Sequence, residues 1–354
     1  MFVRFRAAAD AFNRTIGWRR VGFVLSLTII AAAAVVLYNT LHDIDFEYLY
    51  DSVKSYERHQ IVMAAVFVAA GYFTLTFYDL FALRTIGRKE VPYRTAALAG
   101  FTSYSIGHNL GASVFTGGAV RYRIYSDAGL SAIEVAKICF IAGLTFWLGN
   151  ATVLGLGIAY DPHAASMVDQ LPPWFNRVGA IAALGVLATY VAWVWRTPRV
   201  IGRSDWEVTL PNGPLTLLQI AIGIVDLAFC ALAMYVLMPD EPHIGFITLA
   251  VIFVSATLLG FASHSPGGLG VFDAAMLVAL WQFEKEDVLA GLLLFRLLYY
   301  ITPFAFSLIV LGLREMWISF APRQPAGEAA GRPGPTDAAV PPPTMTGREK
   351  CDAA

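Results

Sequence analysis

Charged residues are scarce in this sequence. Lysine, arginine, aspartate and glutamate together account for 14% of its 354 residues, whereas hydrophobic residues account for 57%. A water-soluble domain could not bury that much apolar surface. The composition therefore excludes an ordinary soluble protein and predicts an all-α polytopic membrane protein.

Cysteine is also rare, and the common catalytic motifs are missing. Cys139 and Cys230 lie in apolar segments and Cys351 in the C-terminal tail, so we expect no disulfide framework and no metal site. The sequence has no Walker motif, Cys-x-x-Cys pair or HExxH, and its hydrophilic loops are too short for an ATPase or an aminoacyl-tRNA site. We therefore expect no catalytic residues, no cofactor and no nucleic-acid partner.

What the sequence has instead is a series of apolar segments with asymmetric flanks. Five arginines lie in residues 1–20, and acidic residues follow the first apolar run. The positive-inside rule therefore places residues 1–20 in the cytoplasm and predicts a retained first span. The six full spans are expected at Val21–Tyr38, Ile61–Leu83, Glu134–Ala159, Val178–Trp195, Leu215–Leu237 and Val288–Leu313. Residues 319–354 are rich in proline, glycine and alanine, which predicts a disordered cytoplasmic tail.

Two further apolar segments are interrupted. Residues 101–123, FTSYSIGHNLGASVFTGGAVRYR, have arginine on both flanks, which predicts a re-entrant hairpin from the cytoplasm. Its halves, of about a dozen residues or fewer, are too short to cross a bilayer. The break SHSPGGLGVF separates Ile244–Ala262 from Val271–Phe283. The sequence leaves open whether this second element is a hairpin from outside or two full spans.

The two halves of the chain share one order of elements. Residues 21–159 and 178–313 each read as span, span, hairpin, span within a transmembrane domain of residues 21–318. The second half is inverted relative to the first. This pattern is typical of alternating-access carriers, in which interrupted segments mark the binding site.

Three charged side chains lie inside apolar segments. Each of Asp79, Asp226 and Arg296 would cost about 2.5 to 3.5 kcal/mol at mid-bilayer if unpaired. An intramembrane arginine suits a lipid phosphate, and a carboxylate suits a cationic headgroup or a coupling proton. The alternative is an internal Asp–Arg pair that only fixes the bundle, or an Asp79 wetted at the interface.

The other candidate residues flank the two breaks. Arg121 and Arg123 could bind anionic lipid, or could simply be positive-inside anchors. The Gly117-Gly118 pair beside them could leave backbone N–H groups open to a phosphate. Asp273 and Glu134 are expected to cap helices rather than to bind. The predicted substrate-binding set is completed by residues at the breaks themselves: His108, Asn109, His264, Gly267 and Gly268.

Long strings of the sequence resemble a known family. YDLFALRTIGRK, SYSIGHNLGASVFTGGAVRYRIYSDAGLSAIEVAK and SHSPGGLGVFDAAML are similar to the membrane region of bifunctional lysylphosphatidylglycerol synthase/flippases. That family joins a lipid-translocating membrane domain to a cytosolic domain that transfers an aminoacyl group from tRNA to phosphatidylglycerol. Because little sequence follows the last span, the resemblance implies a stand-alone flippase-like protein without the aminoacyltransferase.

The sequence therefore predicts a multi-pass inner-membrane carrier with both termini in the cytoplasm. Its expected substrate is an anionic or aminoacylated phospholipid of the phosphatidylglycerol class, moved between leaflets. One alternative is a membrane subunit that presents lipid to a separate aminoacyl- or glycosyltransferase, and another is a non-transporting protein of envelope maintenance. The headgroup, the coupling ion and whether the protein is a homodimer stay open.

Overall fold

The structure is a computed structural model that describes residues 54, 56–111, 113–195, 199–203, 206–263 and 266–320. The predicted first span, Val21–Tyr38, and the tail from residue 321 lie outside these residues, as does His264. The described residues up to Glu315 belong to one compact unit, and the last helix continues to Phe320.

Five of the described helices are long and apolar enough to cross a membrane. They are α4 (Arg58–Thr85), α7 (Ala132–Tyr160), α9 (Pro173–Val194), α10 (Gly213–Val236) and a last continuous helix. The last helix consists of α13 (Lys285–Phe295), the π-helical turn η2 (Arg296–Ile301) and α14 (Thr302–Phe320). They follow the predicted order in this part of the chain, so the all-α polytopic fold is confirmed.

The first broken segment is a pair of antiparallel helices, α5 (Tyr93–Leu110) and α6 (Ser113–Asp127). With 18 and 15 residues, the arms are longer than the dozen predicted. The turn follows Gly111, whose φ of 71° favours glycine. The arms touch closely, because a Cβ on Gly117 would lie 3.1 Å from the carbonyl oxygen of Ser103. Gly117 and Gly118 lie inside α6, where their N–H groups bond to helix carbonyls, so the prediction that they are open to a phosphate is wrong.

The second broken segment consists of α11 (Phe246–Ala262), the 3-10 turn η1 (Pro266–Gly268) and α12 (Val271–Ala279). α12 has 9 residues and is therefore about 14 Å long, less than half of a hydrocarbon core of about 30 Å. The structure thus favours a broken hairpin over two full spans. Gly267, Gly268 and Gly270 have φ values of 60°, 65° and 80°, which explains the run of glycines at this turn.

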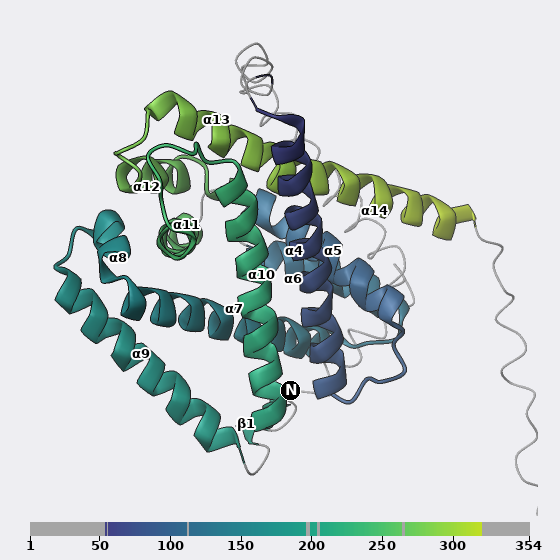
Figure 1. Ribbon diagram of the computed structural model, residues 1–354. Coiled ribbons are helices and arrows are strands. Elements are labelled where there is room, and N and C mark those ends of the chain that lie inside the picture. Colours follow the sequence, from purple (N-terminus) through teal and green to yellow (C-terminus); the bar gives the residue numbers. More distant parts are fainter. Residues whose placement is uncertain are drawn as a thin grey trace, which may run out of the picture. The chain divides into compact units, whose positions relative to one another are not determined.

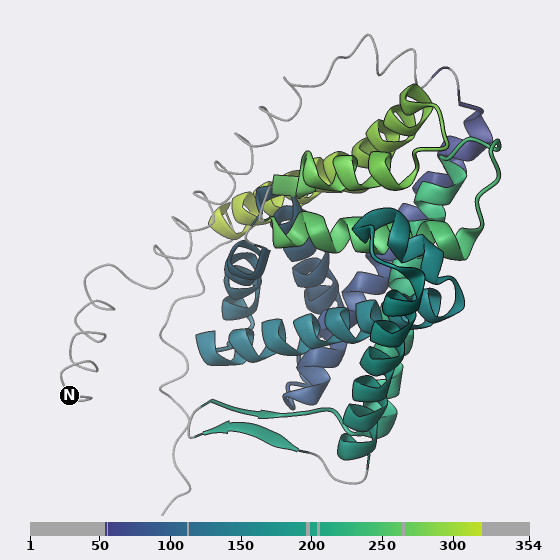
Figure 2. The same ribbon diagram turned by 90° about the vertical axis from the view of Figure 1, so that its left-hand side faces the viewer.

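Two small elements were not predicted. The short helix α8 (Pro162–Asp169) follows α7 and is capped by Asp161, whose side chain accepts a hydrogen bond from the N–H of His163. β1 (Val200–Arg203) and β2 (Trp206–Thr209) form an antiparallel hairpin between α9 and α10, seen in Figure 2. Its few residues carry no long apolar run, so a hydropathy pattern does not reveal it.

The end of α4 and the start of α7 lie at the same side of the bundle. Arg88, just after α4, donates to Glu134 in the first turn of α7 and to Glu90. The hydrogen bond to Glu134 raises the pKa of Arg88, and hydrogen bonds from its own backbone and from Arg88 lower the pKa of Glu90. Glu134 also forms a capping box with Ser131, so its predicted capping role is confirmed. The α5–α6 pair therefore enters and leaves on one side, as a re-entrant hairpin must.

Close packing around α10 holds the centre of the unit together. α4 and α10 lie side by side and α7 crosses them (Figures 1 and 2). At the crossing of α7 and α10, a Cβ built on Gly149 would lie 2.7 Å from the Cα of Gly223. Only two glycines allow this approach of the two backbones.

Replacing Gly149 with alanine should lower the free energy of unfolding by about 1–3 kcal/mol, because the added methyl group must push α7 away from α10. The measurement is unfolding of the purified protein in mixed detergent micelles. Gly185→Ala is the matched control, since nothing lies within 4 Å of the position of its Cβ. Equal stability of the two variants would contradict this account of the helix crossing.

Candidate functional site

A cavity of about 450 Å³ lies between the two broken segments. α5 contributes Tyr104 and His108 to its wall, α7 contributes Phe146, α11 contributes Phe261, and η1 contributes Gly267. Tyr300 of η2 closes another side. The two interruptions that the sequence marked as candidate site segments therefore meet at one cavity.

The mouth of this cavity is apolar. Val114 and Phe115 at the start of α6 are 74% and 80% exposed, and Trp147 of α7 is 61% exposed. All three line the cavity. In a membrane protein, exposed side chains of this kind face lipid tails. The exposed part of the cavity lining is therefore suited to contact with lipid tails.

Arg121 of α6 lies in the cavity wall and is paired with an acidic residue of α4. Its Nε and Nη2 atoms donate to both carboxylate oxygens of Asp79 on α4, at 2.8–3.1 Å. The Tyr125 hydroxyl also donates to Asp79, at 2.8 Å. The Arg121 guanidinium lies 4.7 Å from the centre of the Tyr104 ring. Asp79 is completely buried and paired, and so is not wetted at an interface.

Asp226 is placed differently from Asp79. It lies on α10, is 4% exposed and accepts one hydrogen bond, from the Tyr78 hydroxyl at 3.0 Å. It does not line the cavity. Its partner Tyr78 packs edge to face at 5.8 Å against Tyr104, which does line the cavity. A direct contact with a headgroup in the cavity, which the sequence suggested, is not available in this conformation.

Arg296 is paired with Asp273 rather than with Asp226 or Asp79. Its Nε and Nη2 atoms donate to the two Asp273 oxygens at 3.1 and 2.6 Å, and Nη1 donates to the Gly267 carbonyl at 3.5 Å. Asp273 also accepts the N–H of Gly270, so its predicted capping role is confirmed. Arg296 thereby fixes the glycine turn η1, part of which lines the cavity.

The π-helical turn η2 is held by two side chains of the first half. Tyr72 of α4 donates to the Tyr299 carbonyl at 2.9 Å, and Asn109 of α5 donates to the Tyr300 carbonyl at 3.2 Å. π-turns within long helices often mark functional positions. Asn109 is therefore a support of the cavity wall rather than a part of its surface.

His108 lies on the cavity surface among aromatic rings. Its ring centre is 5.7 Å from that of Tyr104 and 5.5 Å from that of Phe261. His264, the predicted site residue at the break of the second half, lies outside the described part of the chain. Gly267 and Gly268, the last two predicted site residues, both line the cavity.

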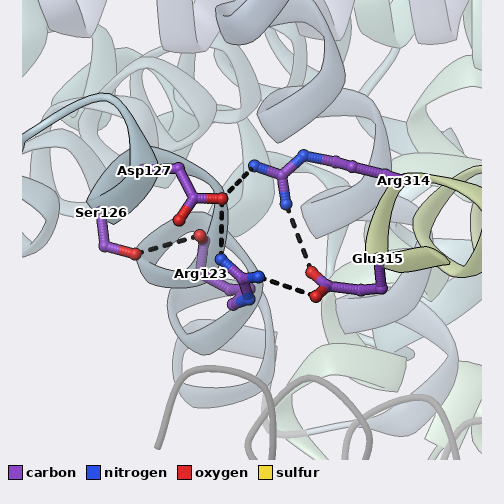
Figure 3. A network of polar contacts seen from close by, with 5 residues as sticks. All are labelled: Arg123, Ser126, Asp127, Arg314 and Glu315. Carbon is purple, nitrogen blue, oxygen red and sulfur yellow. Dashed lines mark hydrogen bonds and ion pairs between the residues drawn. The ribbon is translucent and has the colours of Figure 1, made fainter. Parts of the chain in front are cut away.

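Arg123 lies outside the cavity, in a four-charge network shown in Figure 3. It donates to Asp127 of its own helix at 2.8 Å and to Glu315 of α14 at 2.7 Å. Arg314 joins Asp127 at 2.8 Å and Glu315 at 3.4 Å, which closes the ring. Arg123 is buried and neutralised, unlike a plain positive-inside anchor.

Sequence reasoning missed the tyrosines that organise these charges. Tyr78, Tyr104 and Tyr125 contact Asp226, Arg121 and Asp79 respectively. Tyr78 directly precedes Asp79 in the sequence, which is the one signal that could have drawn attention to it. Across the described residues, no cluster of three or more His, Cys, Asp or Glu side chains could hold a metal ion.

Comparison with known proteins gives three informative relatives, whereas no family model matches the chain. The chain is 27% identical over 277 residues to uncharacterized protein slr0712 of Synechocystis sp., covering 78% of this chain and 86% of that protein. It is 27% identical over 307 residues to inner membrane protein YbhN of Escherichia coli, covering 84% and 93% respectively.

The chain also matches part of much longer proteins. It is 26% identical over 303 residues to phosphatidylglycerol lysyltransferase of Staphylococcus xylosus, covering 80% of this chain but 33% of that protein. The predicted resemblance is thus confirmed: the chain is homologous to YbhN and to about a third of the lysyltransferases. Its apolar helices and its similarity to YbhN support a multi-pass inner-membrane protein. The orientation of its termini stays a prediction.

Proposed function

We propose that this protein moves a phospholipid of the phosphatidylglycerol class, anionic or aminoacylated, between the leaflets of the inner membrane. The observation that carries the proposal is the cavity between the two broken hairpins, which has Arg121 in its wall and exposed apolar side chains at Val114, Phe115 and Trp147. A phospholipid has matching parts, because its headgroup can lie inside while its acyl chains stay in the bilayer. The homologous lysyltransferases are named for an activity on phosphatidylglycerol, which supports this lipid class.

The cavity wall offers groups for both kinds of headgroup. A phosphate can compete with Asp79 for the guanidinium of Arg121, since both anions accept paired N–H groups. α6 begins at Ser113, next to Val114 of the cavity lining, so the positive end of its helix dipole lies close to the cavity. The aromatic faces of Tyr104, Phe146 and Phe261 suit the ammonium of an aminoacyl group.

Movement between leaflets requires access from both sides in turn. The α5–α6 hairpin and the α11–η1–α12 hairpin both reach the cavity, and in the predicted inverted repeat they come from opposite faces. Opening one hairpin while the other stays closed would expose the headgroup to one face at a time. The repeats of residues 21–159 and 178–313 are part of this proposal.

Filling the cavity should stop the movement of lipid. Gly143 of α7 lines the cavity and has no atom within 4 Å of its Cβ position, so the side chain of Gly143→Phe can start into the cavity without displacing the backbone. We expect at least a tenfold slower movement of fluorescent phosphatidylglycerol and lysylphosphatidylglycerol in proteoliposomes, which is about 1.4 kcal/mol in barrier height. Reduction of the dye by a membrane-impermeant reagent measures the movement.

Gly185→Phe is the control for this experiment. Gly185 lies on the exposed surface of α9 and also has no atom within 4 Å of its Cβ position, but it does not line the cavity. The control should move lipid at the wild-type rate. Wild-type vesicles no faster than protein-free vesicles with both lipids, or equal rates for the two variants, would refute translocation through this cavity.

A second function is favoured by the fact that this chain matches only part of the length of the lysyltransferases. Because this chain matches about a third of those proteins, it could serve as a membrane subunit that presents lipid to a separate aminoacyl- or glycosyltransferase. In that case the full chain, purified in mild detergent from its native membrane, should bring such an enzyme with it. Lipid movement in vesicles of the purified chain alone favours the first proposal.

A further inference from the structure

A single buried carboxylate in the membrane-spanning region has no cationic partner among the described residues. One oxygen of Asp226 accepts the hydroxyl of Tyr78, and the other has no hydrogen-bond partner. That second oxygen points toward α4, where it lies 3.8 Å from the Cβ position of Gly71. Asp79, by contrast, accepts bonds from both Arg121 and Tyr125.

The groups that face Asp226 carry no positive charge. They are Tyr72 and Tyr78 of α4, Tyr104 of α5, Tyr299 of η2 and Cys230 of its own helix. Phenol and thiol groups are neutral below about pH 8. No arginine, lysine or histidine of the described residues offsets a charge on Asp226. An ionised carboxylate would therefore lie in the bilayer interior with one neutral hydrogen bond, which is strongly unfavourable.

We propose that Asp226 is a proton-binding site, neutral in this conformation, and that its proton is released and regained as lipid moves; the second part rests on the proposed function. A neutral carboxyl needs no counter-charge, which fits the surroundings of Asp226. Ionisation needs water or a cation, and the cavity that Tyr104 lines can supply either one.

Two tyrosines separate the proton site from the cavity. Tyr78 binds Asp226 and packs against Tyr104, and Tyr104 lies over Arg121 in the cavity wall. Displacement of Arg121 from Asp79 by a lipid phosphate would also move the ring of Tyr104. Water could then reach Asp226, which would lose its proton. Headgroup binding and proton release are linked in this way through three packed side chains.

Infrared spectroscopy of the purified full chain tests the proton site without any transport. At pH 7 we expect the carbonyl band of a protonated carboxyl in the wild type, and its loss in Asp226→Asn. Asp169→Asn is the control, because Asp169 is exposed, and this variant should keep the band. Tyr78→Phe should keep the band but shift it, because its hydrogen bond to Asp226 is removed. Absence of the band in the folded wild type at pH 7 overturns the proposal.

Lipid movement in proteoliposomes tests the coupling. A step that needs a change of protonation varies by up to about tenfold per pH unit, so the wild-type rate should depend on pH and the rate of Asp226→Asn should not. If the rate of lipid movement by Asp226→Asn depends on pH as the wild-type rate does, the proposed coupling is overturned. If the wild type moves no lipid at any pH while the infrared band is present, the proposed function fails and the proton site stands.

Discussion

Asp79→Asn should lower the free energy of unfolding by about 3–5 kcal/mol, the largest loss that we expect from one substitution in this protein. The reason is that Arg121 would stay buried with its charge uncompensated. Two nitrogens of the Arg121 guanidinium donate hydrogen bonds to Asp79. The Tyr104 ring also contacts the guanidinium, but a cation–π contact is too weak to replace a carboxylate. Unfolding by a denaturing detergent in mixed micelles measures the loss.

The double variant Asp79→Asn, Arg121→Gln is the control for this prediction. With both charges removed, the variant should regain most of the lost stability, because neutral amides need no counter-charge. Tyr125→Phe should cost only about 1 kcal/mol, since it removes one of several hydrogen bonds to Asp79. A single variant as stable as the double variant would show that Arg121 is hydrated from the cavity.

The same variant also tests whether a lipid phosphate can take the place of Asp79. Adding phosphatidylglycerol should stabilise Asp79→Asn more than it stabilises the wild type, because the free guanidinium can bind the phosphate. Phosphatidylcholine, whose ammonium offsets its phosphate, should have a smaller effect. Equal effects of the two lipids on the variant would argue against a phosphate contact at Arg121.

The order of the spans could be predicted because hydrophobic runs and their charged flanks are properties of the sequence itself. The lengths of α5 and α6 could not be predicted in the same way. Polar residues such as Thr102 and Asn109 lower the hydropathy of α5, but their side chains bond to carbonyls four residues earlier in the same helix. Such residues can therefore lie in a helix within the membrane.

The sequence marked some residues of the cavity wall, such as His108 and Gly267, but it did not give the pairings of the charged side chains. Gly111 and Gly267 mark the breaks because their positive φ angles favour glycine, and charges within apolar segments, such as Asp79 and Arg296, stand out from their surroundings. The partner of each charge is set by how distant helices pack. Asp79 is 42 residues from Arg121, and Asp273 is 23 residues from Arg296. No periodicity in the sequence encodes those distances.

Removing Glu315 should cost about 3 kcal/mol, because Arg123 and Arg314 would then share the single carboxylate of Asp127. In Figure 3 the four charges form a ring that joins the end of α6 to α14. Arg123 and Glu315 are both buried, so their contact is the costly one to break. Unfolding of Glu315→Ala in mixed micelles measures the loss. Arg94→Ala is the control, because Arg94 is exposed. Its free energy of unfolding should stay within about 0.5 kcal/mol of the wild-type value.

Salt should distinguish the two halves of this ring. The side chain of Asp127 is 42% exposed, so the coupling energy between Arg314 and Asp127 should be below about 1 kcal/mol and should vanish in 1 M salt, where the screening length is about 3 Å. The coupling between Arg123 and Glu315 should persist, because both side chains are at least nine-tenths buried. Double-mutant cycles at low and high salt measure both couplings. Because α14 continues from η2, which carries Arg296 and Tyr300, a salt-resistant coupling would show that the α5–α6 hairpin is firmly attached to the helix that forms part of the cavity wall.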